Sequence, residues 1–448
     1  MGGRCLMDPH LLPYAERQAP RYTSYPSANH FDTSVDANTY EGWLKSLGQN
    51  STLSLYLHIP YCRQLCWYCG CNTFMTRGGD IADFVTTLMM EIDLVASTLG
   101  SRNVDEIHWG GGTPNVLSPA EFRRLLHHID FWFDLSPQMR HAVELDPRYV
   151  TPELATTYAD AGVTRVSLGV QDLNPHVQEA IGRVQPFEQV RAAVKTLRDA
   201  GISELSFDLM YGLPQQSCAD LARTIKLAAD LEPSRIALFG YAHVPWFKRR
   251  QRLINADTLP GLRGRYEQAE LARRLLAELG YESIGLDHFA HSDDPLLVAA
   301  RTKSLRRNFQ GYVASESDAL IGFGPSAISH LPSGYAQNIS TIGAWRRAIE
   351  SNALPVARGH VQSAEDWRRA AIIQSIMCDL EIDLAPWGGW DMFPDAYVAV
   401  AQLAADGIVE LRDSSLKIPP SMRQFSRLVA MTFDAYSSPS TTAHSRAI

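Results

Sequence analysis

Four cysteines stand within ten residues of this chain and offer its most distinctive chemistry. They are Cys62, Cys66, Cys69 and Cys71, in the segment His58-Ile-Pro-Tyr-Cys-Arg-Gln-Leu-Cys-Trp-Tyr-Cys-Gly-Cys-Asn72. Thiolates gathered this tightly repel one another, and cysteine thiolates are the ligands that hold iron–sulfur clusters. The first three spacings, C-x3-C-x2-C, favour a four-iron cluster with three protein ligands. Such a cluster would leave one iron open to a cofactor or a substrate.

Zinc is the main alternative for the cysteine cluster. Zinc sites usually pair two C-x2–4-C elements or add histidines at a comparable spacing. The remaining cysteines, Cys5, Cys218 and Cys378, are scattered singly, and His58 precedes the cluster on a predicted strand. A disulfide framework is disfavoured because the chain is long and otherwise poor in cysteine. The spacing therefore favours iron–sulfur over zinc but leaves zinc open.

A run of three glycines, in Gly110-Gly-Gly-Thr-Pro114, follows a strand predicted to end at Trp109. Successive glycines let a ligand approach the backbone closely and leave N–H and C=O groups free to bind it. A tight turn is the structural alternative, but one or two glycines usually suffice for a turn. A phosphate-binding P-loop is excluded because its Lys-Ser/Thr ending is missing. We therefore predict a ligand-binding loop here.

Polar side chains end three further predicted strands, and these side chains are Glu144, Asp146, Gln171, Asp172 and Asp208. The carboxyl ends of parallel strands converge on one site in barrel folds. Carboxylates and amides there suit ribose hydroxyls or a positively charged group of a ligand. Taken singly, each could be a helix cap or a loop residue, and we assign that role to Asp146 because Pro147 follows it.

Three groups of cations could bind an anionic substrate: Arg183, the run Lys248–Arg250 with Arg252, and the set Arg301, Lys303, Arg306 and Arg307. Arginine side chains match carboxylates in a bidentate way. We interpret the run around residue 250 as a solvated surface. The cations between residues 301 and 307 are the better candidates for an anionic substrate.

Alternating strand and helix patterns position these residues. The predicted strands are Leu53–Ile59, Glu106–Trp109, Ala142–Leu145, Arg165–Val170, Glu204–Met210 and Arg235–Tyr241, and the predicted helices between them are Ile81–Leu99, Pro119–Phe133, Pro152–Ala161, Phe187–Ala200 and Cys218–Leu231. Gly162 and Gly201 stand where glycines that end helices belong. This alternation predicts a parallel sheet with helical crossovers, and six units suggest a complete or partial barrel. A flat, doubly wound sheet is the alternative.

The outer parts of the chain have a different character. Pro20–Pro26 predicts an extended arm, residues 260–282 a helix and Ser283–Asp287 a short strand, while residues 288–345 look irregular, which is typical of a functional covering segment. Helices near 365–380, 393–406 and 420–435 surround a hairpin at Ile408–Ile418, an arrangement that resembles a winged helix. Its last helix offers only Arg423 and Arg427 as cations, so we favour a structural or lid module over a DNA reader. We divide the chain into an arm (1–50), a barrel (51–285), a covering segment (286–362), a C-terminal domain (363–436) and a tail (437–448).

The composition is that of an ordinary globular enzyme of 448 residues, with 45% hydrophobic and 20% charged residues. A net charge of −8 argues against general nucleic-acid binding. No apolar run approaches the length that spans a membrane, and the N-terminus has no signal-like apolar core. An odd number of cysteines, seven, fits a reducing compartment. We therefore expect a cytoplasmic protein without nucleic-acid or membrane partners.

The cysteine loop and the glycine turn resemble those of the radical S-adenosylmethionine (SAM) enzymes. More specifically, the chain resembles the oxygen-independent coproporphyrinogen III oxidases, also called coproporphyrinogen dehydrogenases. The similarity covers Pro20–Pro26, His58–Asn72, Trp109–Pro114, Glu144–Arg148, Ser167–Asp172, Asp208–Pro214, Tyr241–His243, Asp287–Ala290, Asn308–Tyr312 and the C-terminal module. The resemblance implies an α/β fold, a partial (β/α)6 barrel of radical SAM type with an N-terminal arm and a mainly α, winged-helix-like C-terminal domain.

The resemblance also implies roles for individual residues. It makes Cys62, Cys66 and Cys69 the ligands of a [4Fe–4S] cluster and Cys71 a cysteine that is not a ligand. Two SAM molecules per active site are implied, and the positions that match SAM-binding residues are Tyr56, Tyr68, Gly111, Gly112, Thr113, Glu144, Gln171, Arg183, Asp208, Ala242 and Ile328. His58, Phe309 and Gln310 match positions associated with activity.

The reaction implied is the oxidative decarboxylation of two propionate side chains of coproporphyrinogen III to vinyl groups, which gives protoporphyrinogen IX in heme biosynthesis. A reduced cluster would cleave SAM, and the resulting 5′-deoxyadenosyl radical would take a hydrogen from the propionate β-carbon without any need for oxygen. An electron donor such as a flavodoxin or ferredoxin and a monomeric state are also implied. The alternative is a related radical SAM protein that carries or remodels heme, against which stand Pro20–Pro26, Cys69-Gly-Cys71 and Asn308–Tyr312.

Overall fold

Seven parallel strands form the centre of a twelve-stranded sheet in the computed structural model, which describes residues 8–77, 79–314 and 317–437. Across the sheet, the strands are β16 (Val356–Val361), β15 (Gly334–Asn338), β14 (Ile328–Leu331), β13 (Ala319–Phe323), β1 (Thr52–Ile59), β4 (Asn103–Gly111), β5 (Asp134–Leu145), β6 (Arg165–Gln171), β7 (Glu204–Tyr211), β8 (Arg235–Gly240), β10 (His288–Ala290) and β9 (Glu282–Ile284). The run from β13 to β8 is parallel, and the strands outside it pair antiparallel.

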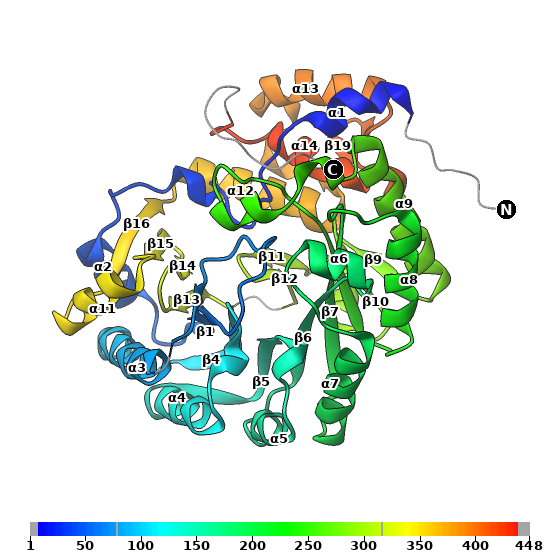
Figure 1. The fold of residues 1–448 in the computed structure, drawn as a ribbon. Coiled ribbons are helices and arrows are strands. Elements are labelled where there is room, and N and C mark those ends of the chain that lie inside the picture. The colour runs from blue at the N-terminus through cyan, green and yellow to red at the C-terminus, as the bar shows by residue number, and fades with distance from the viewer. Residues whose placement is uncertain (1–7, 78, 315–316, 438–448) are drawn as a thin grey trace.

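Helices follow the parallel strands and cover the outer side of the curved sheet (Figure 1). They are α3 (Asp80–Leu99), α4 (Pro119–Trp132), α5 (Pro152–Asp160), α7 (Phe187–Asp199), α8 (Cys218–Ala229) and α9 (Leu262–Glu278), while the short helix α6 (Pro175–Ala180) lies at the carboxyl edge of the strands. This arrangement is the partial barrel of six strand–helix units that the alternation predicts, and not a flat sheet. The residues of β1 are buried on both faces or nearly so, as a parallel strand between helices and a barrel interior requires.

The remaining elements lie at the margins of the barrel or outside it. The helices are α1 (Leu12–Glu16), α2 (Ala37–Ser46), α10 (Pro295–Arg301), α11 (Ile342–Glu350), α12 (Ala364–Asp379), α13 (Pro394–Ala405) and α14 (Ser426–Met431), and the strands are β2 (Tyr61–Cys62), β3 (Phe74–Met75), β11 (Arg306–Asn308), β12 (Gly311–Val313), β17 (Glu381–Asp383), β18 (Glu410–Arg412) and β19 (Ser415–Lys417). Single-turn 3-10 helices are η1 (Pro9–Leu11), η2 (Ala28–His30), η3 (Pro114–Val116), η4 (Pro147–Tyr149), η5 (Arg249–Leu253), η6 (Ala256–Thr258), η7 (Ala385–Trp387), η8 (Trp390–Met392) and η9 (Pro420–Phe425).

Local sequence signals explain where several helices begin and end. Ser118, Ser217 and Ser363 each cap a helix in a reciprocal capping box with an acidic residue three positions later. Gly162 and Gly201, predicted to end helices, adopt positive φ angles of 72° and 96°. These signals lie within a few residues of one another, so they can be detected from the sequence.

Two expectations about the elements are wrong. Strand β5 begins at Asp134 rather than near Ala142, because residues 136–139 bulge out of its pairing with β4 and accommodate Pro137 there. Residues 288–345 are not irregular, since they contain α10, α11 and six short strands, β10 to β15. One of these strands, β13, pairs in parallel with β1 and so extends the barrel sheet. The tail from residue 438 and Cys5 lie outside the described residues.

The N-terminal arm and the C-terminal module, residues 364–433, share one hydrophobic core. Side chains of the arm that contribute to it are Leu11, Ala15, Ala19, Tyr22 and Tyr25, and they pack with apolar residues of α12, α13 and α14. Figure 1 shows α1 beside α13 and α14 above the open side of the barrel. With the three-stranded sheet β17–β19–β18, the module has the winged-helix-like form that was predicted.

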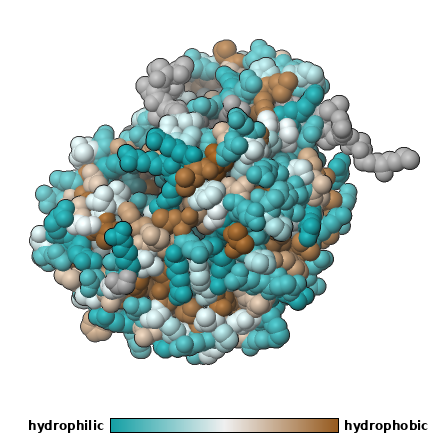
Figure 2. All heavy atoms as spheres, viewed as in Figure 1, coloured by the Kyte–Doolittle hydropathy of each residue, from teal (hydrophilic) through white to brown (hydrophobic). Residues whose placement is uncertain are grey.

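The surface in Figure 2 is largely hydrophilic, with hydrophobic side chains scattered among polar ones on the face shown. Among the described residues, no helix combines the length and the apolar character needed to cross a membrane.

A buried carboxyl group ties the long helix α3 to the extension of the barrel sheet. Glu91 is 1% exposed, and its oxygens accept hydrogen bonds from Gly324 N (2.8 Å), Asn338 Nδ2 (2.6 Å) and Trp345 Nε1 (3.1 Å). Burial raises the pKa of Glu91 to about 8, although the three N–H donors favour the ionised form. Because Gly324 lies against the backbone of His58, this contact also fixes the end of β13 beside β1.

We predict that Glu91→Ala lowers the free energy of unfolding by about 3 kcal/mol, because it leaves three buried N–H donors without an acceptor. Chemical denaturation measures the change. Asp83→Ala, which removes an exposed carboxylate from the same helix, should change stability by less than about 0.5 kcal/mol. The folded protein holds a proton at Glu91 that the unfolded chain releases, so the difference between wild type and Glu91→Ala should narrow as the pH rises from about 5 to about 8. A difference that widens over this range would contradict the assignment.

Candidate active site

The cysteine loop, residues 62–73, leaves the barrel directly after β1 at the carboxyl edge of the parallel strands. Strands β2 and β3 close the loop by pairing in parallel, and Phe74 N donates to Pro60 O at 2.7 Å. Trp67 N donates to Ile181 O at 3.0 Å, which ties the middle of the loop to the segment after α6. The predicted ligands therefore lie on a loop that is fixed at its base and at its tip.

Each of the three predicted ligand thiols accepts a hydrogen bond from a different part of the chain. The pairs are Thr113 Oγ1 to Cys62 Sγ (3.4 Å), Arg183 Nη1 to Cys66 Sγ (3.3 Å) and Cys71 N to Cys69 Sγ (3.4 Å). N–H and O–H donors directed at sulfur stabilise the thiolate form, which is the form that binds iron. Burial nevertheless raises the pKa of the Cys62 thiol to about 11, so the hydrogen bond from Thr113 offsets only part of the cost of forming that thiolate.

Cys69 and Cys71 differ in their protonation. Hydrogen bonding from Cys71 lowers the pKa of the Cys69 thiol to about 6, and the same contact raises the pKa of Cys71 well above its ordinary value. The geometry therefore favours Cys69 as a thiolate and Cys71 as a thiol. Within the described residues, no group of three or more His, Cys, Asp or Glu side chains is arranged to hold a single metal ion. A four-iron cluster, whose thiolate ligands bind separate iron atoms, needs no such group.

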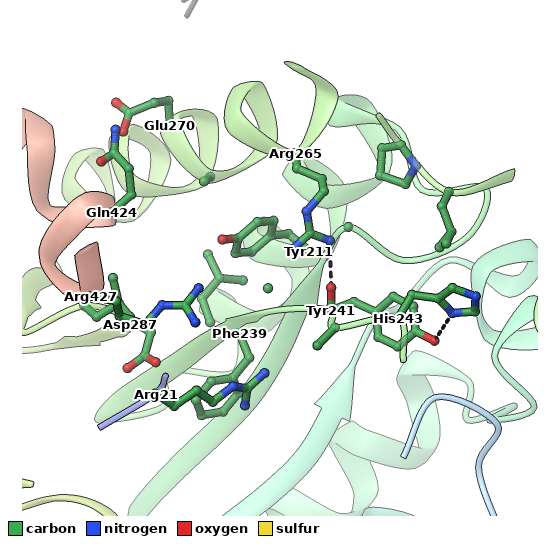
Figure 3. Close-up of a pocket in the computed structure, with 18 of the residues that line it drawn as sticks. Arg21, Tyr211, Phe239, Tyr241, His243, Arg265, Glu270, Asp287, Gln424 and Arg427 are labelled. Atoms are coloured by element: carbon green, nitrogen blue, oxygen red, sulfur yellow. Dashed lines mark hydrogen bonds between the residues drawn. The ribbon is translucent and has the colours of Figure 1, made fainter. Parts of the chain in front are cut away.

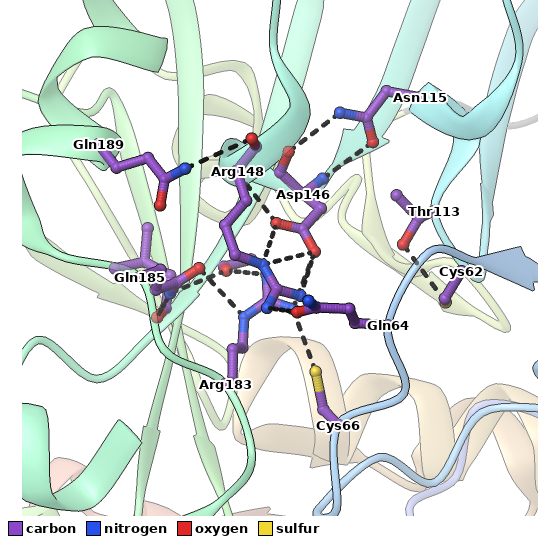
Figure 4. Close-up of polar contacts among 12 residues, drawn as sticks. Cys62, Gln64, Cys66, Thr113, Asn115, Asp146, Arg148, Arg183, Gln185 and Gln189 are labelled. Carbon is purple, nitrogen blue, oxygen red and sulfur yellow. Dashed lines mark hydrogen bonds and ion pairs between the residues drawn. The ribbon is translucent and has the colours of Figure 1, made fainter. Parts of the chain in front are cut away.

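A buried carboxylate, Asp146, joins the loop to the barrel (Figure 4). Its Oδ2 atom lies 2.7 Å from Arg148 Nη2 and 3.2 Å from Arg183 Nη1. Arg183 Nη2 also donates to Gly169 O at 2.6 Å, and Arg148 Nη1 donates to Gln64 Oε1 at 2.7 Å. Burial would raise the pKa of Asp146, but the charge of Arg183 and the contacts with Arg148 lower it. Asp146 caps η4, as predicted, and in addition it forms ion pairs with two buried arginines.

The three glycines at the carboxyl end of β4, Gly110 to Gly112, are required by atoms of the chain itself. A Cβ atom on Gly110 would overlap the carboxyl group of Glu144, and one on Gly111 would overlap the His58 ring. A Cβ atom on Gly112 would meet the backbone of residues 59–61, to which Gly112 N donates at 2.8 Å. Only glycine fits these positions, and Gly111 also has a φ of 101°. The run therefore brings Glu144 and His58 close to the strand end.

His58 is buried and held by two partners. Its Nδ1 atom lies 3.1 Å from the hydroxyl of Tyr56, and its Nε2 atom lies 3.1 Å from the carbonyl oxygen of Asn72. The carbonyl can only accept, so Nε2 carries the proton and Nδ1 accepts from the hydroxyl. Burial lowers the pKa of His58, so the ring is neutral near pH 7.

Two carboxyl groups on β5 and β7 face the same interior space. Glu144 Oε1 lies 2.9 Å from His108 Nε2, and Asp208 Oδ2 accepts from Ser167 Oγ at 3.2 Å. Burial would raise the pKa of Glu144, but the contact with His108 and the N–H of Gly111 lower it. Burial and the nearby charge of Glu144 raise the pKa of Asp208 to about 7. One carboxylate is thus ionised and its neighbour titrates near neutral pH, a combination common at functional sites.

The other predicted site residues lie on separate elements. Gln171 ends β6 with a φ of 65°, and Tyr68 O and Ala242 O both accept from the side-chain amide of Gln251. Ile328 begins β14, beside the part of β13 that pairs with Tyr56. These residues surround the same strand edge as the cysteine loop.

Phe309 and Gln310 form the turn between β11 and β12, and Phe309 lines a second cavity with His330 and Tyr335. The Phe309 ring lies 6.5 Å from Phe31 and 5.9 Å from Tyr335, measured between ring centroids. The side-chain amide of Gln310 is buried, and neither Nε2 nor Oε1 has a hydrogen-bond partner among the described residues. A buried amide without a partner is costly, so Gln310 has the character of a residue that awaits a ligand.

A cavity of about 530 Å³ opens beyond the carboxyl ends of β7 and β8 (Figure 3). Ala242 lines it, together with Tyr211, Phe239 and Tyr241. Six arginines also line it: Arg21, Arg265, Arg273, Arg307, Arg423 and Arg427. This size and this lining suit a large organic anion.

The expectation for the cations near residue 301 needs correction. Arg301 pairs with Glu282 and Lys303 pairs with Glu381, both at 2.6 Å on the surface. Arg307 alone of that group lines the cavity. The sequence provided no local reason to distinguish these positions, because the distinction depends on which way each side chain leaves its strand or turn.

His108 and five of the cavity arginines were missed at the sequence level. His108 could have been found, since Glu106, His108 and Gly110 alternate along β4 and must share its interior face. The arginines stand in segments as far apart as residues 21 and 427, and no short spacing connects them.

Comparison with known proteins identifies relatives over nearly the whole chain. The Radical SAM superfamily model matches residues 56–228. The chain is 45% identical to the oxygen-independent coproporphyrinogen III oxidase of Bradyrhizobium diazoefficiens over 442 residues, which cover 97% of this chain and 98% of the relative. It is 35% identical over 426 residues to the protein of that name from Escherichia coli, with 93% of each chain covered.

A solved structure also matches this chain over nearly its whole length. The radical SAM coproporphyrinogen III oxidase of Escherichia coli superposes with a TM-score of 0.90 at 33% sequence identity, and the match covers 97% of this chain and 100% of that one. At this level of agreement the two chains share the same fold, including the arm and the C-terminal module.

We predict that Asp146→Ala lowers the free energy of unfolding by about 3 to 5 kcal/mol, because it leaves Arg148 and Arg183 buried without a countercharge. Asp199→Ala removes an exposed partner of Lys195 and should cost less than about 1 kcal/mol. The pKa of Asp146 lies below the ordinary 3.8, so its contribution is present above that pH and is lost as the pH falls below it. Urea denaturation at neutral and acidic pH measures both effects, and equal losses for the two variants would refute the role of Asp146.

Proposed function

The chain belongs to the oxygen-independent coproporphyrinogen III oxidase family of the radical SAM superfamily, and we propose that it decarboxylates two propionate side chains of coproporphyrinogen III to vinyl groups. The product is protoporphyrinogen IX, and the reaction serves heme biosynthesis. The observation that carries this proposal is the placement of the three-thiol loop and the arginine-lined cavity at the same edge of one barrel.

Family membership implies a [4Fe–4S] cluster and SAM as cofactors. When bound, they supply a carbon-centred radical that removes a hydrogen atom from the propionate β-carbon. Cys62, Cys66 and Cys69 hold the cluster, and Cys71 stays a thiol beside it. Their hydrogen bonds to Thr113, Arg183 and Cys71 N support this assignment.

The strand edge binds SAM through two kinds of groups. The ionised Glu144 carboxylate suits a positively charged ligand group, and Gly111 and Gly112 contribute backbone groups beside it. Asp208 and Gln171 supply oxygens and an amide for ribose hydroxyls. The remaining members of this set are Tyr56, Tyr68, Thr113, Arg183, Ala242 and Ile328.

A second SAM molecule is accommodated next to the first. Support for it comes from the distribution of the proposed ligands, since Ile328 approaches from the sheet extension whereas Glu144 and Asp208 lie on β5 and β7. Phe309 and Gln310 approach from the β11–β12 turn, and the unpartnered amide of Gln310 provides one donor and one acceptor there. The neutral ring of His58 orients the Tyr56 hydroxyl. It also fixes the end of the cysteine loop by donating a hydrogen bond to the carbonyl oxygen of Asn72.

The resemblance to the family also implies an electron donor, an oligomeric state and a compartment. A small electron carrier such as a flavodoxin or ferredoxin reduces the cluster, and the enzyme works as a cytoplasmic monomer without nucleic-acid or membrane partners. Arg423 and Arg427, the cations that a DNA-reading module would need to present, line the internal cavity instead. The negative net charge is consistent with that.

An anaerobic assay tests this function directly. Reconstituted protein, SAM, a strong chemical reductant and coproporphyrinogen III should yield about two CO2 per substrate molecule and protoporphyrinogen IX, measured by chromatography after oxidation to the fluorescent porphyrin. The alternative, a related protein that carries or remodels heme, predicts cleavage of SAM without CO2 and stoichiometric retention of heme. That result would overturn the oxidase assignment.

We predict opposite outcomes for two neighbouring cysteines. Cys62→Ala should lose most of the iron and sulfide and all activity, because it removes a ligand. Cys71→Ala should retain the cluster absorbance and the iron content, because a fourth thiolate would close the iron that SAM needs. Elemental analysis of the two purified variants measures this. Loss of the cluster from both, or zinc in place of iron in the wild type, would refute the three-ligand assignment.

A further inference from the structure

The cavity beyond β7 and β8 draws its cations from parts of the chain that are distant in sequence. Arg21 comes from the N-terminal arm, Arg307 from β11, and Arg265 and Arg273 from α9. Arg423 and Arg427 come from η9 and α14 of the C-terminal module. Figure 3 shows Arg21 and Arg427 near Asp287, with Arg265 over Tyr211 farther along the cavity. Tertiary packing of five segments therefore creates one cationic chamber.

The positive charge of this chamber exceeds its negative charge. Only two carboxylates, Glu270 and Asp287, line it with the six arginines. Glu270 is already paired with Arg273 at 2.9 Å. Burial would raise the pKa of Asp287, but the hydrogen bond from His288 and the charge of Arg307 lower it to about 2. Asp287 is thus ionised, and the arginines that line the chamber outnumber its carboxyl groups by six to two.

Arg423 shows the imbalance most clearly. Its Nε and Nη1 atoms are buried, and neither has a hydrogen-bond partner among the described residues. Burial also lowers the pKa of Arg423, and burial together with the charge of Arg21 lowers the pKa of Arg427 to about 10. A buried guanidinium whose nitrogens lack partners is unfavourable for folding, so Arg423 is explained by an anion that arrives later.

We propose that Arg21 and Arg423 bind propionate carboxylates of the tetrapyrrole, so that the N-terminal arm and the C-terminal module form the carboxylate-binding wall of the substrate cavity. This assignment rests on the proposed function. The substrate carries four propionate carboxylates, which are the anions that such arginines bind. The C-terminal module thus serves as a wall for the substrate and not as a reader of DNA.

The number of carboxylates also determines how tightly the cavity binds the substrate, the intermediate and the product. Each decarboxylation removes one negative charge and so removes one favourable contact with the arginines. The cavity therefore binds the tetracarboxylate more tightly than the tricarboxylate intermediate, and the intermediate more tightly than the dicarboxylate product. Loss of carboxylates during the reaction thus promotes the release of the product.

The test uses the cluster-loaded enzyme and the variant Arg423→Gln. Because each charge-assisted hydrogen bond is worth about 1.5 to 3 kcal/mol, KM for coproporphyrinogen III should rise about ten-fold or more, while kcat and the affinity for SAM change little. Anaerobic ultrafiltration with coproporphyrinogen III in the absence of SAM should show the same loss of affinity without turnover. Arg21→Gln should weaken binding in the same direction, and Arg423→Lys should restore part of it.

A stability measurement separates this role from a structural one. Removal of an unpaired buried charge should leave the Tm of Arg423→Gln unchanged or higher, whereas loss of a structural contact would lower it. The matched control is Arg301→Gln, which removes a surface arginine paired with Glu282 and should leave KM unchanged. If the wild type turns over normally and KM is unaltered in both Arg423→Gln and Arg21→Gln, the assignment of these arginines is wrong. The proposed function would stand. A wild-type enzyme that neither binds nor decarboxylates coproporphyrinogen III would overturn the proposed function and the assignment with it.

Discussion

The carboxylate of Asp146 is the interaction on which the arrangement around the cysteine loop depends. It directly follows β5 and forms ion pairs with Arg148, which reaches Gln64 in the loop, and with Arg183, which reaches Cys66 and the end of β6. Three segments are thereby fixed relative to one another by a single buried charge. Because the pair is buried, its loss would leave two cations without compensation, and the loop would lose its orientation together with the stability.

Much of the barrel and the cysteine loop could be predicted from the sequence, because their signals are local. Six strands, the helices between them and the glycines at 162 and 201 follow from periodicity and from turn residues. The strands between residues 288 and 338 escaped prediction because they are three to five residues long and carry no clear period. The cavity arginines escaped for a different reason: Arg21, Arg265 and Arg423 meet only when the arm, α9 and the module pack together.

The site contains buried polar groups that lower the stability of the fold and that a barrel without a binding function would avoid. The amide of Gln310 and two nitrogens of Arg423 are buried without partners, and Asp208 and Glu144 place two carboxyl groups in one interior space. Buried polar groups without partners and neighbouring carboxyl groups concentrate where a protein binds a ligand. Here they lie around the strand edge and the cavity, while the far side of the sheet packs apolar residues against helices.

The shared core of the arm and the C-terminal module has a consequence for how the protein is made. The arm is synthesised before the barrel, and the surface that it packs against is synthesised after it, so the two meet only when translation has passed residue 433. The barrel and its cysteine loop can fold earlier, as N-terminal units do. The chamber itself appears late, so a prematurely terminated chain would display the cysteine loop beside an open, water-filled interior. Completion of the polypeptide is therefore the step that encloses the site.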